Sequence, residues 1–271
     1  MASHTRTHWL SRGWITLVIL LGSSMVLTAC GGRGKPPESY AGSARYSYEQ
    51  GAEALDDGDY LEAIRQFTFV KNKYPYSKFA ALAELRIADA YFEQEKFAEA
   101  IQAYGTFVES RPNHEKVDYA MWRRALSHFE QIPSDFILFP PAHEKDQRAT
   151  TEALRALELF VQRFPESKDI AEARERVRDC KGMLADHELY VARFYLRDKR
   201  PLSAVGRLEG VYNTYREDLP RHWSEAAYLL ARTYEVLGRR AEAMATASAL
   251  IKAYPDRQEA VDAEDFIAEL N

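Results

Sequence analysis

The chain has 271 residues, a formal net charge of −5 at pH 7 and 46% hydrophobic residues. Its lysines and arginines are dispersed, whereas nucleic-acid binding rests on a concentrated basic face, so we expect no nucleic-acid partner. The length suits one elongated domain or two small ones.

Residues 1–29 have the pattern of a signal peptide. Arg6 and Arg12 precede an almost wholly apolar run, Trp14–Leu21, and small residues follow it. The run is too short to cross ~30 Å of hydrocarbon, which needs roughly 20 residues. The Leu27-Thr28-Ala29-Cys30 ending resembles the lipobox of bacterial lipoproteins, in which the cysteine is acylated and becomes the first residue. We therefore expect lipidation at Cys30; an ordinary signal peptide with a cysteine there by chance is the alternative.

Residues 30–43 are rich in Gly, Pro and Ser and lack periodicity, so we predict a flexible lipidated tether. Gly31 stands where an aspartate would resemble an inner-membrane retention signal, which favours the outer membrane. Removal of residues 1–29 takes away Arg6 and Arg12 and leaves a net charge of −7. With Cys30 acylated, Cys180 is the remaining thiol, and we predict that it is a small buried residue.

A 37-residue repeat runs through the rest of the chain, and each unit has the pattern of two short amphipathic helices. Small or turn-forming residues recur at this step: Gly51, Ala88 and Ala125; Ala63 and Ala100; Pro75 and Pro112. Small residues let helix axes approach, and proline ends a helix. The pattern resembles the tetratricopeptide repeat, whose usual spacing is 34 residues.

We predict an all-α tetratricopeptide-repeat superhelix of about five helix pairs. Repeats 1–3 span residues 44–167, and repeats 4–5 with a terminal helix from about Gln258 span residues 168–271. About 16 extra residues separate the two helices of the third unit, which places an insertion at about residues 132–147. Each unit buries its apolar face against its neighbours.

The sequence gives little support for catalysis or metal binding. The glycines at 31–34 precede Lys35, but Pro36 follows and no strand leads into them, so a phosphate loop is not indicated. The histidines of the mature chain are scattered without ligand spacing. We expect a binding scaffold that is not an enzyme, with no metal and no cofactor beyond the covalent lipid on Cys30.

Several stretches are similar to the BamD family of outer-membrane assembly lipoproteins of Gram-negative bacteria. They are Arg111-Pro112-Asn113-His114, Val117-Asp118-Tyr119-Ala120, Asp146-Gln147-Arg148, Arg163-Phe164-Pro165-Glu166-Ser167, His187 to Tyr195, and Arg207-Leu208-Glu209-Gly210. The resemblance covers roughly Tyr40 to Pro255 and the lipobox. The chain departs from it in the apolar stretch 136–141 and in Asp218-Leu219-Pro220, which replaces a terminal Tyr-Pro.

The resemblance implies a periplasmic scaffold, lipid-anchored to the outer membrane, in the machinery that folds β-barrel proteins into it. It implies that the C-terminal repeats dock on the barrel component, BamA, within a complex of several subunits. The N-terminal repeats would receive targeting segments of unfolded outer-membrane proteins. A periplasmic tetratricopeptide adaptor in cell-wall synthesis or envelope division is one alternative, and an accessory subunit or degraded catalytic domain is another.

We predict a substrate groove on the first helices of units 1–3, because these helices line the concave face of a tetratricopeptide superhelix. The repeat positions concerned are Tyr48, Leu55, Leu82, Leu85, Asp89, Phe92, Tyr119, Trp122, Leu126 and Phe129. This set is more apolar than a solvated wall should be, which favours an apolar, aromatic-ended strand as ligand. Packing of these side chains against Phe136–Phe139 of the insertion is the alternative.

Arg207 and Glu209 are predicted partner-docking residues on a helix from about Leu202 to Tyr215. Residues two apart on a helix point to different sides, so Glu209 does not neutralise Arg207. Arg207 then either extends into solvent or awaits an external carboxylate. The resemblance places this position at the partner-facing end of the molecule.

Overall fold

The computed structural model describes residues 39–133 and 141–270. The predicted signal peptide, Cys30 and Phe136–Phe139 lie outside the described residues. The predicted tether was too long at its end, because residues 40–43 form the first turn of a helix. Within the described residues the chain forms α-helices and one short 3-10 helix, without strands. The α-helices are α1 Tyr40–Asp56, α2 Tyr60–Lys73, α3 Lys78–Glu93, α4 Phe97–Ser110, α5 Val117–Glu130, α6 Arg148–Arg163, α7 Ile170–Arg197, α8 Pro201–Thr214, α9 Pro220–Val236, α10 Arg240–Ala253 and α11 Gln258–Leu270, and the 3-10 helix η1 is Ala142–Glu144.

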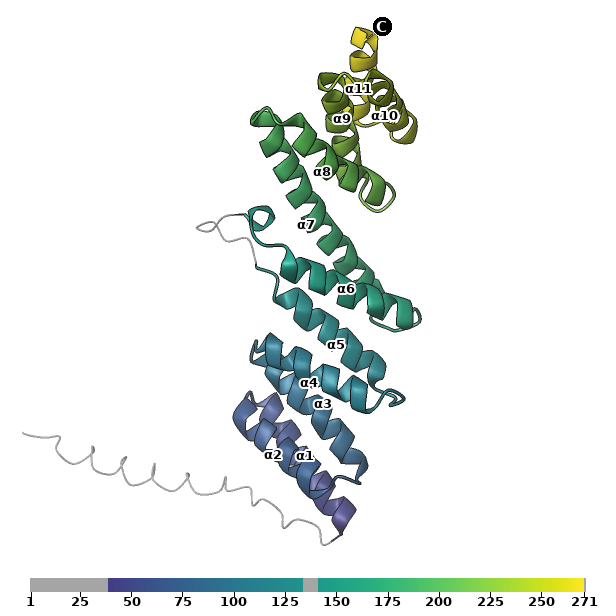
Figure 1. Ribbon diagram of the computed structural model, residues 1–271. Helices are drawn as coiled ribbons and strands as arrows, with labels where there is room; N and C mark the ends of the chain where they lie inside the picture. The colour runs from purple at the N-terminus through teal and green to yellow at the C-terminus, as the bar shows by residue number, and fades with distance from the viewer. Residues whose placement is uncertain (1–38, 134–140, 271) are drawn as a thin grey trace, which may run out of the picture.

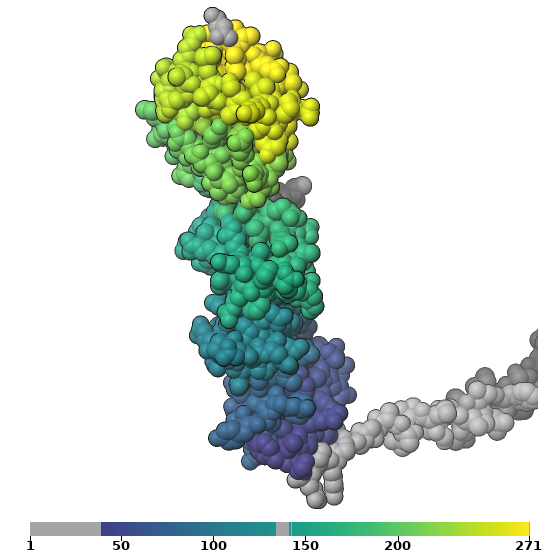
Figure 2. Space-filling view, turned by 90° about the vertical axis from the view of Figure 1, so that its right-hand side faces the viewer, coloured from purple at the N-terminus to yellow at the C-terminus, as the bar shows by residue number. Residues whose placement is uncertain are grey.

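The helices stack in pairs in chain order and form an elongated solenoid (Figures 1 and 2). Each helix packs against the next one, from α1 on α2 to α10 on α11. In addition, α1 contacts α3, α7 contacts α9, and α9 contacts α11. The pairs are α1–α2, α3–α4, α5–α6, α7–α8 and α9–α10, and α11 covers the last pair. The prediction of an all-α superhelix of five helix pairs is confirmed.

Small residues stand where the helices approach each other most closely. Ala63, Ala88 and Ala100 are completely buried. A Cβ atom built on Gly51 would lie 2.8 Å from Cε1 of Phe67, closer than real carbon atoms come. Gly51 therefore lets α1 rest directly on the Phe67 ring of α2, which explains why the repeat has a small residue at this step.

In four of the five pairs, the turn between the two helices contains a residue in the left-handed region. Gly58 follows α1 with φ +78°, and Gly238 follows α9 with φ +71°. Glu95 after α3 and Lys199 after α7 adopt φ of +58° and +57° without being glycine. Because a Cβ atom disfavours this conformation, these two turns are strained relative to the glycine turns.

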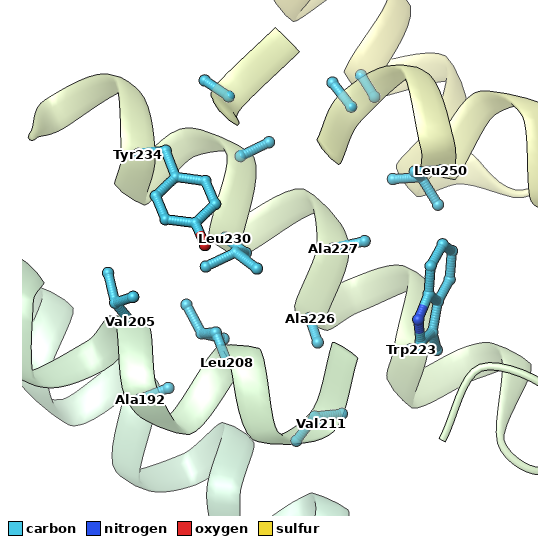
Figure 3. Packing of buried hydrophobic residues seen from close by; sticks show 14 of the residues in the cluster. Ala192, Val205, Leu208, Val211, Trp223, Ala226, Ala227, Leu230, Tyr234 and Leu250 are labelled. Atoms are coloured by element: carbon cyan, nitrogen blue, oxygen red, sulfur yellow. The ribbon is translucent and has the colours of Figure 1, made fainter. Parts of the chain in front are cut away.

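The buried hydrophobic residues of the described chain form three clusters. The N-terminal core surrounds Phe67, the middle core extends from Ala81 to Cys180, and the C-terminal core extends from Ala185 to Phe266. Figure 3 shows the C-terminal core, where Leu208 and Val211 of α8 face α9 and Leu250 of α10 lies beside Trp223. The 28 residues of α7, about 42 Å of helix, belong to both the middle and the C-terminal cores.

Candidate protein-binding surfaces

The predicted groove residues lie on α1, α3 and α5, but they differ in exposure. Leu85, Asp89 and Trp122 are buried, and the other predicted residues are half-buried: Tyr48, Leu55, Leu82, Phe92, Tyr119, Leu126 and Phe129. Trp122 is 5% exposed, and its ring lies 5.5 Å from the Phe160 ring of α6, measured between centroids. Trp122 therefore joins α5 to α6, and the half-buried residues form the accessible part of this surface. Their role in substrate binding stays a prediction.

A polar network centred on Asp89 joins the second and third units. The Tyr104 hydroxyl of α4 and the Tyr119 hydroxyl of α5 donate to Oδ1 of Asp89 at 2.5 and 2.7 Å. Arg86, one turn earlier on α3, donates to Oδ2 at 3.1 Å. Burial, together with the Asp89 carboxylate, raises the pKa of both tyrosines, so they remain protonated donors. Of these partners, only Tyr119 belongs to the predicted groove set.

Two arginines extend this network toward the surface. Arg123 donates from Nε to the Tyr104 oxygen at 3.2 Å and from Nη2 to Glu93 at 3.0 Å. Its guanidinium lies 3.8 Å from the centroid of the Phe92 ring, a cation–π contact. Arg86 also donates to the Tyr48 hydroxyl at 3.4 Å. The surface thus combines aromatic rings with ordered guanidinium groups, which can contact both apolar and carboxylate groups of a peptide.

The described part of the insertion packs on the fourth unit. The helix η1 lies against α7, where the His187 ring donates from Nδ1 to the His143 carbonyl at 2.7 Å. The His143 ring also lies 5.0 Å from the Tyr190 ring. This segment therefore connects units 3 and 4. The alternative that Phe136–Phe139 pack in the groove is not tested, because these residues lie outside the described ranges.

Arg207 has a partner within the chain that was not predicted from the sequence, and its role in partner docking stays a prediction. Its Nη1 donates to both carboxylate oxygens of Glu188 at 3.0 Å, and Glu188 lies on α7. Glu209 accepts a hydrogen bond from the Tyr234 hydroxyl of α9 at 2.6 Å. Because the Arg207 side chain is 44% exposed, the ion pair lies at the surface and can still be contacted from outside.

A shallow hollow lies beside this ion pair along α8. It is lined by Glu188, Leu202, Ser203, Gly206, Arg207, Gly210, Thr214 and Tyr215. Cβ atoms built on Gly206 and Gly210 would meet no other atom within 4 Å, and Leu202 is largely exposed. The four-residue spacing of the two glycines, which places them on one helix face, could have indicated this hollow from the sequence.

Neither a metal centre nor a membrane-spanning helix is found in residues 39–133 and 141–270. No three His, Cys, Asp or Glu side chains gather there in an arrangement that could hold a metal ion. None of the helices in these ranges is both long and apolar enough to cross a membrane. Cys180 is a buried free thiol, as predicted, and burial raises its pKa to about 12.

Comparison with known proteins gives a consistent result. The model of a family described as outer membrane lipoprotein, YfiO, matches residues 41–248. The protein named outer membrane protein assembly factor BamD from Caulobacter vibrioides is 30% identical over 250 residues, which cover 92% of this chain and 79% of the relative. The BamD of Neisseria meningitidis serogroup A is 27% identical over 231 residues, which cover 83% and 85%.

Solved structures with a similar arrangement of helices are more distant. The TPR2AB domain of yeast Sti1, solved in a complex with pHSP90, is 12% identical with a TM-score of 0.42 and covers 83% of this chain and 84% of that one. The fold assignment rests on the helix pairs described above and not on this likeness.

Proposed function

Because the chain belongs to the YfiO family of outer membrane lipoproteins, we propose that it is a non-catalytic scaffold for the assembly of β-barrel proteins into the bacterial outer membrane. The observation that carries this proposal is the family match over residues 41–248, which extends from α1 into α10. The assembly-factor names of the relatives favour this function over an adaptor in cell-wall synthesis.

The central test is purification of the detergent-solubilised lipoprotein from its own cells with its bound partners. We expect a large β-barrel protein of the BamA type, together with other subunits of its complex. Recovery of cell-wall synthesis enzymes without a barrel protein would contradict the proposal and favour the adaptor function.

Anchoring through Cys30 is part of the proposal and rests on the lipobox. Cys30→Ala should give a chain that keeps its signal peptide or is released into the periplasm. Mass spectrometry of the mature amino terminus checks this directly, and an unmodified cysteine there would contradict it.

The half-buried residues of α1, α3 and α5 are the proposed site for the terminal segments of unfolded barrel proteins. Phe92 is the best test position, because its ring is partly exposed and is already held by Arg123. Phe92→Ala should weaken binding of an aromatic-ended barrel peptide by about thirtyfold or more if Phe92 is an anchor. Trp122→Ala is a poor test because it removes packing between α5 and α6. Unchanged peptide binding by Phe92→Ala would remove Phe92 from the site.

The hollow along α8 is the proposed docking site for the barrel component. Arg207→Glu repels Glu188 and should strongly reduce co-purification of that partner, while Arg240→Glu, on exposed α10 surface, serves as the matched control. Leu202→Asp tests the same hollow without touching the C-terminal core, which deletion of all residues after Tyr195 would destroy. Full retention of the partner by both hollow variants would exclude this surface.

A further inference from the structure

Aromatic side chains gather at the end of the solenoid where α1 begins and where α2 turns into α3. Tyr40 and Phe69 are 49% and 47% exposed, and Tyr76 is 96% exposed. The Tyr74 ring packs edge-on against both Tyr40 and Phe69, with centroid distances of 5.0 and 5.8 Å. We call these four residues the N-terminal patch. An exposed cluster of aromatic rings is a candidate binding surface.

The stretch of sequence that carries three of the four patch residues has a charge opposite to that of the whole chain. Residues 63–83 contain no aspartate or glutamate, although the net charge of the protein is −5. The same stretch carries Lys71, Lys73 and Lys78. Lys73 and Lys78 are exposed, whereas Lys71 is half-buried and lines a hollow with Glu84 and Glu99. The patch therefore combines aromatic rings with positive charge, which favours an anionic ligand surface.

The proposed lipid anchor lies close to the N-terminal patch in the chain. Cys30 precedes Tyr40 by ten residues. Even a fully extended chain of ten residues reaches at most about 35 Å. The patch lies at the α1 end of the solenoid, and α11 lies at the opposite end (Figure 1). Acyl chains on Cys30 would therefore keep the patch near the membrane surface at high effective concentration.

We propose that the N-terminal patch binds the anionic phospholipid headgroups of the leaflet that holds the Cys30 acyl chains. The proposal rests on the lipidation that is part of the proposed function. Tyrosine concentrates at the membrane–water interface, where its ring is in an apolar layer and its hydroxyl in a polar one. Lysines close to an anionic leaflet strengthen binding by about fivefold each.

This contact sets the orientation of the protein. The acyl chains would hold the molecule on the membrane, but the anchor alone does not set the direction in which the solenoid points. The patch fixes the α1 end against the leaflet and gives the surface of α1, α3 and α5 a defined direction relative to the membrane.

The test uses the full mature lipoprotein in vesicles of phosphatidylcholine alone or mixed with anionic phosphatidylglycerol. A fluorophore is attached at Tyr76→Cys, and headgroup-labelled lipid serves as quencher. Val236→Cys, an exposed position on α9, is the control site. Cys180 is completely buried and does not compete for the label. We expect quenching at position 76 that requires anionic lipid, and little quenching at position 236.

Charge variants separate the N-terminal patch from a general effect of net charge. Lys71→Gln, Lys73→Gln and Lys78→Gln together should abolish most of the quenching at position 76. The matched control changes the exposed Lys116, Lys199 and Lys252 to Gln and should leave it unchanged. Circular dichroism verifies that both triple variants fold.

The outcomes distinguish this proposal from the proposed function. Flotation with the vesicles reports the acyl anchor by itself. A chain that floats but shows equal quenching at positions 76 and 236 overturns the patch proposal and leaves the anchor and the assembly function standing. The patch proposal is also overturned if the fluorophore at position 76 becomes protected only when the barrel partner is added and does not respond to anionic lipid. A mature chain that does not float contradicts lipidation and the patch proposal together.

Discussion

Asp89 shows how one buried charge can connect neighbouring repeats. The residue is 4% exposed, and the donors that reach its carboxylate come from α3, α4 and α5. A buried carboxylate is costly unless its oxygens are hydrogen-bonded, so these donors hold the three helices in one relative position. The network thereby also fixes Arg86 and Arg123 on the proposed substrate surface.

Removal of the Asp89 carboxylate should destabilise the protein more than removal of one hydroxyl. Asp89→Ala is expected to lower the free energy of unfolding by on the order of 2–4 kcal/mol, because the buried Tyr104 hydroxyl loses its acceptor. Tyr104→Phe should cost about 1 kcal/mol. In urea titrations the double variant should lose clearly less than the sum of the two. Strict additivity would mean that the two groups are not coupled.

His128 should make the stability sensitive to mild acid. Burial, and to a lesser degree Arg124, lowers the pKa of His128 below its ordinary value of 6.5, and Glu152 opposes this. As the pH falls below about 6.5, the unfolded chain gains this proton and the folded chain does not. The free energy of unfolding should therefore fall until the pH reaches the lowered pKa, and then level off with respect to this group. His128→Gln should remove that part of the slope, and an identical pH profile in the variant would contradict the assignment.

Spacing along the sequence predicts which face a residue occupies but not which residue it meets. Asp89 and Tyr119 were both placed on the predicted groove because they hold related repeat positions, and they do form a hydrogen bond. The contact of Arg207 with Glu188 could not be predicted in this way. This contact depends on how α7 crosses α8. The prediction compared Arg207 only with residues of its own helix, where it has no partner.

At the scale of the helices, the recurring pattern of small and aromatic residues predicted the five pairs, although the 37-residue step itself holds only from the first unit into the third. The step marks the places where two helices touch, and small residues there are a direct requirement of packing. The contact of η1 with α7 was beyond prediction, because the insertion follows no repeat and its partner lies 44 residues away in the sequence. The candidate site was predicted in outline only, since periodicity did not separate buried Trp122 from half-buried Phe92.

Two glycines inside helices should respond in opposite directions to replacement by alanine. Gly51→Ala places a methyl group against Phe67 and should lower the free energy of unfolding by about 1–3 kcal/mol. Gly182→Ala, in α7, meets no atom within 4 Å and should raise it by about 0.5–1 kcal/mol through helix propensity. Thermal or urea unfolding measures both, and an equal response at the two positions would show that α1 and α2 are not closely packed.

At the scale of the whole molecule, the separate cores predict local responses to core damage. Because helices contact mainly their neighbours in the stack, destabilisation should spread little along the solenoid. Phe67→Ala should accelerate amide hydrogen exchange in α1 and α2 with little effect on α9 and α10. Leu250→Ala, in the C-terminal core, should do the reverse. Uniform acceleration throughout the chain would mean that the solenoid unfolds as one cooperative unit.

The continuous helix α7 also fixes the relative orientation of the two proposed protein-binding surfaces. Its first half is packed into the middle core and its second half into the C-terminal core. Each residue inserted near Gly182 would turn everything after it by about 100° and advance it by about 1.5 Å. One added alanine would rotate the α8 hollow away from its present orientation relative to the N-terminal surface, whereas seven added residues would restore that orientation to within about 20°. A partner that spans both surfaces would therefore tolerate added length in multiples of two turns far better than a single extra residue.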